Sequence, residues 1–295
     1  MNGVIIVNRK YGNASIKIEK KIDRLIKEFN DLNVTIDVII NDGTLVTLKD
    51  NDIVCNIKDN DFIIYLDKDI YTVRCLEKAG YKVFSSSEFI SLCDDKMLTN
   101  IEVSKMGINV PTTISFPLTF FNYEEEKEEK EFINKVINEL SLPLVFKLSY
   151  GSLGEGVKLV HSFDEALKAY KEYKTSKAFF QKYIDASSSS IRVLVIDKKI
   201  ITAIKRINSD DFRSNASNGL STSSPYTMSE KMKDDVYKLI DKFNIGYAGI
   251  DFVLDKDDKY YFLEMNSNAF FFEAEKVSGF NIAKEYALYI LNNIA

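Results

Sequence analysis

The chain has 295 residues, of which 45% are hydrophobic and 28% charged, a composition typical of a globular protein and not of a disordered or fibrous one. Its 39 basic residues are outnumbered by 44 acidic ones, and the net charge of −5 disfavours a nucleic-acid-binding protein with a basic surface. The length is enough for two or three modules around a shared cleft.

Cysteine and hydropathy patterns narrow the class further. The three cysteines are widely spaced and odd in number, so they predict neither a disulfide framework nor a zinc site. The first apolar run is too short for a signal peptide, and no run approaches the roughly 18 to 20 residues that span a bilayer. We therefore expect a cytoplasmic protein that binds neither membrane nor nucleic acid.

The N-terminal part alternates short apolar runs with helical patterns. This β-α-β order predicts a small parallel sheet covered by helices. We expect residues 1–92 to form an N-terminal α/β domain. Its expected strands and helices are 4–8, 15–30, 35–40, 62–66, 71–79 and 82–84.

The pattern changes after residue 92, and we expect a central domain over residues 93–186. A helix at 94–106 ends at Gly107, and a second, acid-rich helix follows at 123–140. A third helix begins at Ser162, where Glu165 three residues later completes a capping box. The remaining elements expected here are strands 144–148, 157–161 and 178–183, with a glycine-rich loop between the first two.

The rest of the chain predicts a C-terminal domain over residues 187–295, built on antiparallel strands. A serine run at 187–190 precedes two strands, and the polar segment 208–225 is long enough to be a functional loop. The elements expected here are strands 191–196 and 200–207, helix 229–243, hairpin 247–266 and a helix from about 282.

The hairpin at 247–266 places oxygen-bearing side chains on one face. Side chains alternate along a strand, so Asp251, Glu264 and Asn266 are expected to share a face, with Asp251 opposite Phe262 across a four-residue turn. Oxygen ligands without His or Cys suit Mg²⁺ or Mn²⁺. The alternative is an exposed face whose acids only keep the protein soluble. The opposite face is expected to carry Ile250, Phe252, Leu254, Tyr261, Leu263 and Met265.

The glycine-rich loop at 149–156 indicates phosphate binding. It is not a Walker motif, because Lys158 comes one residue too late and a strand follows in place of a helix. Glycines in such a loop allow backbone N–H groups to approach phosphates, and Lys147 at the end of the preceding strand supplies a positive charge. An ordinary hairpin turn is the alternative interpretation.

Several cations occur where an anion would explain them. Arg192 and Lys205 lie on neighbouring apolar strands, where an unpaired buried charge would cost several kcal/mol, on the order of 3–5. Arg213 follows, with Asn215 close behind. Lys96 stands at an expected helix start, where the helix dipole disfavours a lysine unless an anion is near.

Taken together, these motifs resemble those of the ATP-grasp superfamily, and specifically the RimK-type carboxylate–amine ligases. The resemblance runs from about residue 84 to the C-terminus, and eight short motifs occur in the order of the family. The motifs are CDDK (93–96), PLVFKLSYGSLGEGV (143–157), FFQKYI (179–184), SIRVLVID (190–197), TAIKRI (202–207), DFRSN (211–215), AGIDF (248–252) and FLEMNSN (262–268), the last followed by EKVSG (275–279).

The resemblance implies an α/β ATP-grasp fold with a small parallel-sheet N-terminal domain, a central glycine-loop lid domain and a C-terminal antiparallel-sheet domain. It also implies ATP and Mg²⁺ (or Mn²⁺) as cofactors. The residues implied to hold ATP are Lys96 and Lys147 at the phosphates, Ser149, Gly151, Ser152, Gly154 and Gly156 in the closing loop, and Gln181, Lys182, Tyr183 and Ile184 at the adenine. The implied metal ligands are Asp251, Glu264 and Asn266. The residues implied around the γ-phosphate and the acyl-phosphate are Arg192, Lys205, Arg213 and Asn215.

Two positions depart from the family pattern. Ser190 stands where relatives commonly have an acid, which puts a carboxylate contact to ribose in doubt. The metal-binding strand leads into Phe270, Phe271 and Phe272 where relatives often have a Ser-Pro-Gly turn. The aromatic run is expected either to shape an acceptor site or to belong to the core.

The activity implied by the resemblance is the Mg²⁺-dependent ligation of a carboxylate to an amine through an acyl-phosphate, with release of ADP and phosphate. The partners would be a small-molecule or peptide carboxylate and an amine acceptor, and a homo-oligomer is expected. Two alternatives stay open: a ligase that forms ester or amide cross-links in a precursor peptide, and a nucleotide-binding sensor without catalysis. The motifs do not choose among acids, acceptors or numbers of additions.

Overall fold

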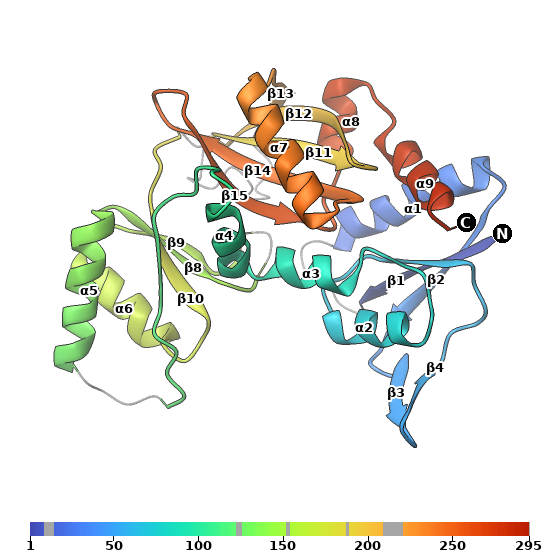
Figure 1. Cartoon of the computed structure of the whole chain (residues 1–295), viewed down its shortest axis with the longest axis horizontal. Coiled ribbons are helices and arrows are strands. Elements are labelled where there is room, and N and C mark those ends of the chain that lie inside the picture. Colours follow the sequence, from blue (N-terminus) through green and yellow to red (C-terminus); the bar gives the residue numbers. More distant parts are fainter. Residues whose placement is uncertain (9–14, 122–125, 152–153, 187–188, 209–220, 295) are drawn as a thin grey trace.

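The computed structural model describes residues 1–8, 15–121, 126–151, 154–186, 189–208 and 221–294. In these residues one parallel and two larger antiparallel sheets follow one another along the chain, each with helices packed against it, and a two-stranded sheet adjoins the first (Figure 1). This mixed α/β architecture confirms the fold class expected from the sequence. No helix within the described ranges is both long and apolar enough to span a membrane.

The N-terminal sheet is parallel, with strand order β2-β1-β5-β6, and is covered on both faces. Alternate residues of β1 divide between two cores, since Ile5 and Val7 face α1 while Val4 and Ile6 face α2. A small antiparallel hairpin, β3–β4, was not expected. The elements are β1 (Asn2–Asn8), α1 (Ser15–Asp31), β2 (Thr35–Asn41), β3 (Val46–Lys49), β4 (Asp52–Cys55), β5 (Phe62–Tyr65), α2 (Ile70–Lys78) and β6 (Val83–Phe84).

Two short helices, α3 (Ser87–Asp94) and α4 (Lys96–Ser104), connect this sheet to the next, where the sequence predicted one helix over 94–106. The break falls at Asp95, whose extended backbone ends α3 and whose side chain accepts a hydrogen bond from the Leu98 N–H at 3.1 Å. A capping aspartate therefore begins a new helix, and Lys96 is its first residue.

The central sheet has strand order β7-β10-β8-β9, and helices α5 and α6 pack against it. The predicted cap of α6 is present, because the Ser162 hydroxyl accepts from the Glu165 N–H at 3.2 Å. The Glu165 carboxylate accepts from the N–H of His161 instead of Ser162, so the reciprocal half of the capping box is displaced by one residue. The elements are β7 (Thr113–Ser115), α5 (Glu126–Leu140), β8 (Leu144–Leu148), β9 (Val157–Val160), α6 (Phe163–Tyr173) and β10 (Ala178–Lys182).

The C-terminal sheet is antiparallel, with strand order β13-β12-β11-β14-β15. Strand β13 and helix α8 were not expected from the sequence. Most of the predicted functional loop at 208–225 lies outside the described residues, and its last part forms β13. The elements are β11 (Ser189–Ile196), β12 (Lys199–Asn208), β13 (Ser221–Pro225), α7 (Glu230–Phe243), β14 (Tyr247–Leu254), β15 (Tyr260–Asn266), α8 (Phe272–Ser278) and α9 (Ile282–Asn292).

The β14–β15 hairpin corrects the predicted register. Leu254 pairs with Tyr260 and Phe252 with Phe262, and a bulge after Asp251 then brings Glu264 directly opposite that residue. A bulge reverses side-chain parity beyond it. As a result Tyr260 and Phe262 face the core, where Tyr261 and Leu263 were expected.

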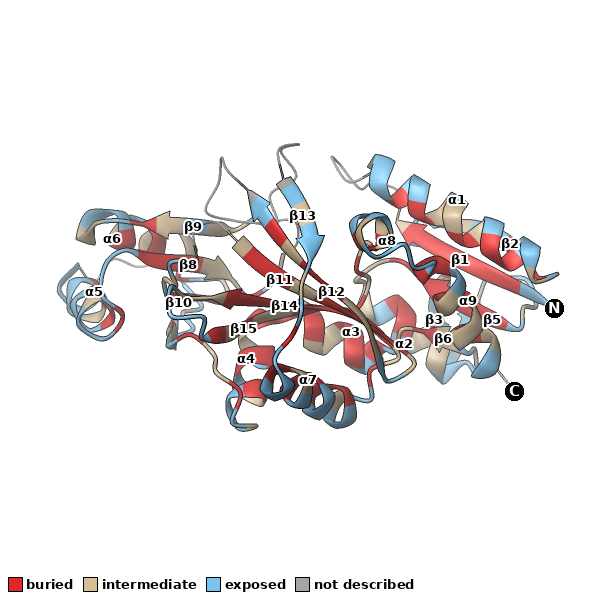
Figure 2. Cartoon of the chain, turned by 90° about the horizontal axis from the view of Figure 1, so that it is seen from above, coloured by how far each residue is buried: buried red, intermediate tan, exposed pale blue. Residues whose placement is uncertain are grey.

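The two ends of the described chain share one hydrophobic core. Helix α1 packs against α9 (Figures 1 and 2). Residues of both helices belong to one buried cluster with Phe271 and residues of β1 and β5. The last helix therefore packs onto the N-terminal part of the chain through α1. The domain boundaries at 92/93 and 186/187 stay a proposal.

Candidate functional site

Two lysines from different elements meet at the glycine loop, and we call Lys96 and Lys147 the lysine pair. Lys96 is 8% exposed, and its Nζ donates to the Gly151 carbonyl at 2.6 Å. Its backbone N–H donates to the Ser149 carbonyl at 2.9 Å. Lys96, in the first turn of α4, therefore binds the loop at both Ser149 and Gly151.

Lys147 lies partly buried at the end of β8. Its Nζ donates to Gln181 Oε1 at 2.7 Å, and Gln181 in turn donates to the Thr113 hydroxyl at 2.9 Å. Burial lowers the pKa of Lys147 to about 8, and the nearby charge of Glu264 only partly offsets this effect. Burial also lowers the pKa of Lys96. Within the described part of the chain, neither ammonium group is hydrogen-bonded to a carboxylate.

The glycine loop has a backbone that other residues adopt with difficulty. Gly151, Gly154 and Gly156 all have positive φ angles, of 140°, 79° and 70°. At Gly156 there is also no room, because a Cβ would lie 2.7 Å from the side chain of Leu148. Ser152 lies outside the described residues. The loop thus depends on glycine, as the phosphate-binding interpretation requires.

The segment expected to hold adenine continues from β10. Gln181 is 2% exposed and points at Lys147, whereas the Lys182 side chain is exposed. The Lys182 N–H already donates to the Thr112 carbonyl at 2.8 Å. Tyr183 and Ile184, which follow the strand, are partly buried. A base held by backbone groups would therefore use groups of this segment other than the Lys182 N–H.

A second group of cations surrounds Asp251, and we call Arg192, Arg206 and Asp251 the arginine cluster. Arg192 donates to both carboxylate oxygens of Asp251, at 2.8 and 2.6 Å, and Arg206 Nη2 lies 3.0 Å from Oδ1. The Asp251 side chain is fully buried. Burial alone would raise its pKa, but the two guanidinium groups lower it to about 2. The carboxylate of Asp251 is therefore ionised, and the two guanidinium groups offset its negative charge.

Arg206 was missed by the sequence analysis, which chose the neighbouring Lys205. Arg206 pairs across the ladder with Ser190, whose hydroxyl accepts from Nη2 at 2.9 Å. Lys205 pairs with Ile191 and faces the opposite side of the sheet, where it lines a separate cavity of about 430 Å³. The structure therefore corrects the placement of Lys205, because adjacent strand residues point to opposite faces. Arg213 and Asn215 lie outside the described residues.

Glu264 and Asn266 lie at the end of β15 that faces the lysine pair. Asn266 Nδ2 donates to Glu264 Oε1 at 3.3 Å, and both side chains are partly exposed. The charge of Glu264 acts on the pKa of Lys96, Lys147 and Arg192 in the raising direction, so this carboxylate lies near both the lysine pair and the arginine cluster.

The oxygen donors of these strands fit a hard divalent cation. Glu264 lies directly across the ladder from Asp251, and Asn266 contacts Glu264. Each carboxylate oxygen has two acceptor directions, so Asp251 can accept from its arginines and still offer a lone pair. Within the described ranges there is no cluster of three or more His, Cys, Asp or Glu side chains that would suit a metal, so the amide of Asn266 is needed to complete a three-donor set.

Two further residues near the site were not predicted. Lys68, in the loop after β5, donates to Asp94 at 2.6 Å, and its charge adds to burial in lowering the pKa of Lys96. Glu273, in α8, accepts from the Ser223 hydroxyl at 3.2 Å and is one of the acids whose charge acts on Arg192. Lys68 and Glu273 lie in segments outside the site motifs. No short sequence pattern indicates where these segments lie relative to the motifs.

The aromatic run after β15 belongs to the core. Phe271 is fully buried, and Phe270 and Phe272 are partly buried and pack against the same cluster. The interpretation that Phe270–Phe272 form part of the core is therefore favoured over an acceptor site lined by these rings.

Comparison with known proteins gives three findings. A family model described as RimK-like ATP-grasp domain matches residues 93–290. The chain is 31% identical over 212 residues to the uncharacterized MG012 homolog of Mycoplasma pneumoniae, covering 70% of this chain and 72% of that protein. It is 26% identical over 238 residues to the alpha-aminoadipate–LysW ligase LysX of Saccharolobus solfataricus, covering 77% and 82%.

The fold is also similar to a solved ligase. The D-alanine–D-alanine ligase of Bacillus anthracis in complex with ATP superposes with a TM-score of 0.74 at 19% sequence identity, covering 100% of this chain and 97% of that one. At this identity the likeness concerns the fold alone. Together with the family match, it confirms the resemblance drawn from the sequence motifs.

Proposed function

The chain belongs to the RimK-like ATP-grasp family of ligases, and from this premise we propose that it activates a carboxylate as an acyl-phosphate with ATP and joins it to an amine. One observation carries the proposal most directly. The lysine pair places two ammonium groups beside a glycine loop without a hydrogen-bonded carboxylate among the described residues. Such a pair is suited to the phosphates of a nucleotide, which would supply the missing negative charge.

The proposed reaction has two steps. A carboxylate oxygen of the first substrate attacks the γ-phosphorus of ATP, the bond to the β–γ bridging oxygen breaks, and ADP leaves with that oxygen. The amine nitrogen of the second substrate then attacks the carbonyl carbon of the acyl-phosphate. Phosphate leaves with the former carboxylate oxygen, and the nitrogen loses a proton to give the amide.

The residues of the chain act in this reaction by binding and charge stabilisation. Lys96 and Lys147 would bind the phosphates, and the loop at 149–156 would cover them and exclude water. Arg192 and Arg206 would stabilise the charge that moves from the γ-phosphate to the acyl-phosphate. Phosphoryl transfer depends mainly on positioning and electrostatics, so a site without histidine is chemically sufficient.

Three oxygen donors would hold the metal. Glu264, Asn266 and Asp251 form an oxygen-only set suited to Mg²⁺ or Mn²⁺, which when bound would neutralise phosphate charge. Arg213 and Asn215 keep their proposed place around the transferred group. We expect Arg213→Ala to bind ATP nearly as the wild type does but to lose about 10²-fold in product formation, by analogy with other charge-stabilising donors.

The substrates are proposed by class. The LysX relative is named for the joining of alpha-aminoadipate to LysW, so we infer that an acidic amino acid is one substrate of this chain and a peptide or small-molecule carboxylate the other. Glutamate and aminoadipate are therefore the first amines to test, followed by dipeptides and longer peptides. A homo-oligomer of this chain is also proposed.

The test is substrate-dependent ADP release with hydroxylamine as a trap. In the presence of Mg-ATP and the correct acid, an acyl-phosphate reacts with hydroxylamine to give a hydroxamate even when the natural amine is absent. We expect ADP and hydroxamate in equal amounts, and an amide when an amine replaces hydroxylamine. If ATP binds but no acid or peptide stimulates ADP release, the ligase proposal is wrong and the sensor alternative replaces it.

A further inference from the structure

Helix α1 places a lysine side chain inside the protein. Lys21 is 1% exposed, and its Nζ lies 5.1 Å from the ring centre of Tyr247 and 5.7 Å from that of Phe271. None of its hydrogen bonds to described residues goes to a carboxylate. Burial lowers the pKa of Lys21 to about 7. Burying an ammonium group is costly and the aromatic rings offset only part of that cost, whereas a Met side chain of similar length would fill the space without it. Its presence therefore calls for a role other than packing.

The hydrogen bonds of Lys21 go to the segment that follows the proposed metal ligand Asn266. Its Nζ donates to Asn268 Oδ1 and, at 2.9 Å, to the carbonyl of Ala269. The hydroxyl of Tyr247 donates to the same carbonyl at 2.6 Å. The chain just beyond β15 is thus fixed by a side chain from the other end of the molecule.

This segment also supports the arginine cluster. Ala269 packs against Gly249, where a Cβ would lie 2.7 Å from the Ala269 Cβ and 3.4 Å from Arg192 Nε. Gly249 pairs with Asn266 in the β14–β15 ladder. The contacts therefore run without a gap from Lys21 through Ala269 and Gly249 to Arg192.

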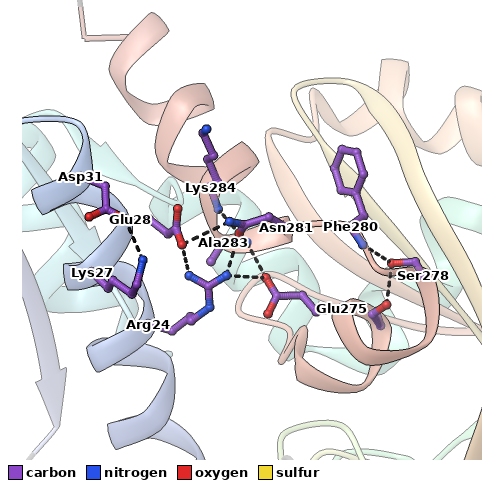
Figure 3. Close-up of polar contacts among 11 residues, drawn as sticks. Arg24, Lys27, Glu28, Asp31, Glu275, Ser278, Phe280, Asn281, Ala283 and Lys284 are labelled. Carbon is purple, nitrogen blue, oxygen red and sulfur yellow. Dashed lines mark hydrogen bonds and ion pairs between the residues drawn. The ribbon is translucent and has the colours of Figure 1, made fainter.

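The helix that carries Lys21 is itself held in place one turn further on (Figure 3). Arg24 contacts Glu28 and donates to Asn281 Oδ1 at 2.8 Å, and it lies 3.6 Å from Glu275. Asn281 also donates to Glu28 at 3.2 Å. These contacts connect α1 to α8 and to the segment between α8 and α9. They therefore fix the position of the helix that carries Lys21.

We propose that Lys21 is a positioning residue that sets the conformation of the segment 267–269 and thereby the placement of Asn266 and Arg192 in the site. The proposal rests on the proposed function, because it assumes that Asn266 binds a metal ion. Residues that orient metal ligands from outside the coordination shell commonly affect metal affinity or activity by about 10- to 100-fold when replaced.

Three variants separate positioning from general stability. Lys21→Met removes the charge and the donors but keeps the length, Lys21→Gln keeps a donor without the charge, and Lys20→Met changes an exposed lysine on the same helix. Mn²⁺ serves as the probe, and its dissociation constant is measured by electron paramagnetic resonance in the presence of ADP. Thermal unfolding is followed for each protein, and half-saturating Mn²⁺ is measured in the ADP-release assay.

We expect Lys21→Met to raise the Mn²⁺ dissociation constant by about 10-fold or more, Lys21→Gln to raise it less, and Lys20→Met to leave it unchanged. Loss of folded protein would lower the number of Mn²⁺ sites without changing the dissociation constant, so the two effects are distinguishable. If Lys21→Met folds and binds Mn²⁺ as tightly as the wild type, the proposal is overturned. If Lys21→Met does not fold, the comparison of Lys21→Gln with Lys20→Met decides in the same way.

The wild type and one further variant test the premise separately. If wild-type protein binds no Mn²⁺ with ADP, or if Glu264→Gln binds it normally, the proposed metal site fails and takes this inference with it. If the wild type binds Mn²⁺ and Glu264→Gln does not, the metal site stands, and the Lys21 variants then test the positioning role alone.

Discussion

The lysine pair and the arginine cluster both lie near Glu264, but their charges are balanced in different ways. Lys96 and Lys147 donate to neutral groups, a backbone carbonyl and an amide oxygen. Arg192 and Arg206 share the fully buried carboxylate of Asp251. The first arrangement leaves both positive charges for a ligand to neutralise, whereas in the second a buried carboxylate already offsets one of the two positive charges. We therefore expect changes at the lysine pair to affect binding and turnover, and changes at the arginine cluster to affect the fold as well.

The largest effect is expected at the arginine cluster. Asp251→Asn leaves two buried guanidinium groups without a counter-charge, which should reduce the free energy of unfolding by about 3–5 kcal/mol. Urea denaturation in the presence of a chelator measures this loss without any contribution from bound metal. Glu264→Gln is the matched control, because Glu264 is partly exposed and we expect it to lose activity but not stability. An Asp251→Asn protein as stable as the wild type would remove the contrast between the two clusters.

The next effect is expected at the lysine pair. Lys147→Met should lower ATP-dependent turnover by about 10² or more, since it removes a charge that meets the phosphates. Stability should change little, because the lost hydrogen bond to the buried Gln181 is offset by removal of a buried ammonium group that no described carboxylate bonds. ADP release and urea denaturation are measured on the same preparation. Lys158→Met, at an exposed lysine of β9, is the control and should behave as the wild type. A parallel loss of stability in Lys147→Met would mean that this lysine is structural.

The two clusters should also differ in their response to pH. The pKa of Lys147 is lowered from 10.5 to about 8, so above pH 8 the free protein loses the ammonium group that ATP requires. The ATP association constant should therefore fall with rising pH, by up to about tenfold per pH unit above 8 from this one proton. The same shift makes folding more favourable as pH rises from 8 to 10.5, because the unfolded state binds more protons in that range.

Calorimetric ATP titrations between about pH 7 and 9.5 measure this dependence, and Lys147→Met should reduce it. The arginine cluster contributes nothing here, since the pKa of Asp251 is about 2 and guanidinium groups stay protonated. The arginine cluster instead makes the stability of the fold depend on pH under acidic conditions. The pKa of Asp251 lies below its ordinary value of 3.8, so the stability it contributes is complete above that value and is lost as pH falls towards 2. Equal ATP affinity at pH 7 and 9.5 would contradict the role of the lysine pair.

The smallest effect is expected at Ser190, which contacts Arg206 of the arginine cluster. Ser190→Ala removes the hydroxyl that accepts two N–H groups of Arg206, which should cost about 1 kcal/mol of unfolding free energy. Turnover should change less than twofold, about 0.4 kcal/mol or less. Ser224→Ala, on the exposed edge strand β13, is the control and should stay within about 0.5 kcal/mol of the wild type. A larger loss of turnover in Ser190→Ala would indicate that Arg206 needs this hydroxyl for the reaction.

The sequence was most informative where the chemistry is local. Alternation along one hairpin predicted a common face for Asp251 and Glu264, and the ladder shows them paired, although in a register that the bulge changes. The unfavourable start of α4 marked Lys96. The glycine spacing marked a loop whose positive φ angles the structure confirms. In each case the signal depends on residues within one element or one turn.

The parts that could not be predicted depend on contacts between distant segments. The bulge after Asp251 gives β15 one more residue than β14 in the ladder, and no sequence motif in the turn predicts it. To decide whether Lys205 or Arg206 faces the site, one must know the register of β12 against β11. The polar turn at 197–198 that joins these strands does not fix this register. Lys21 has the spacing of an ordinary surface lysine on α1, and only its packing against Tyr247 reveals that it is buried.

The core shared by the two ends of the chain has a consequence for synthesis. Ile5, Leu25 and Phe29 are buried together with Ile282, Tyr286 and Ile290 of α9. The ribosome synthesises α1 long before α9, so the apolar side chains of α1 that pack against α9 stay exposed to water until the last helix emerges. We therefore expect nascent chains that lack α9 to engage chaperones and to be cut readily by proteases in their N-terminal part. Full protection should appear only after release, when α9 packs against α1.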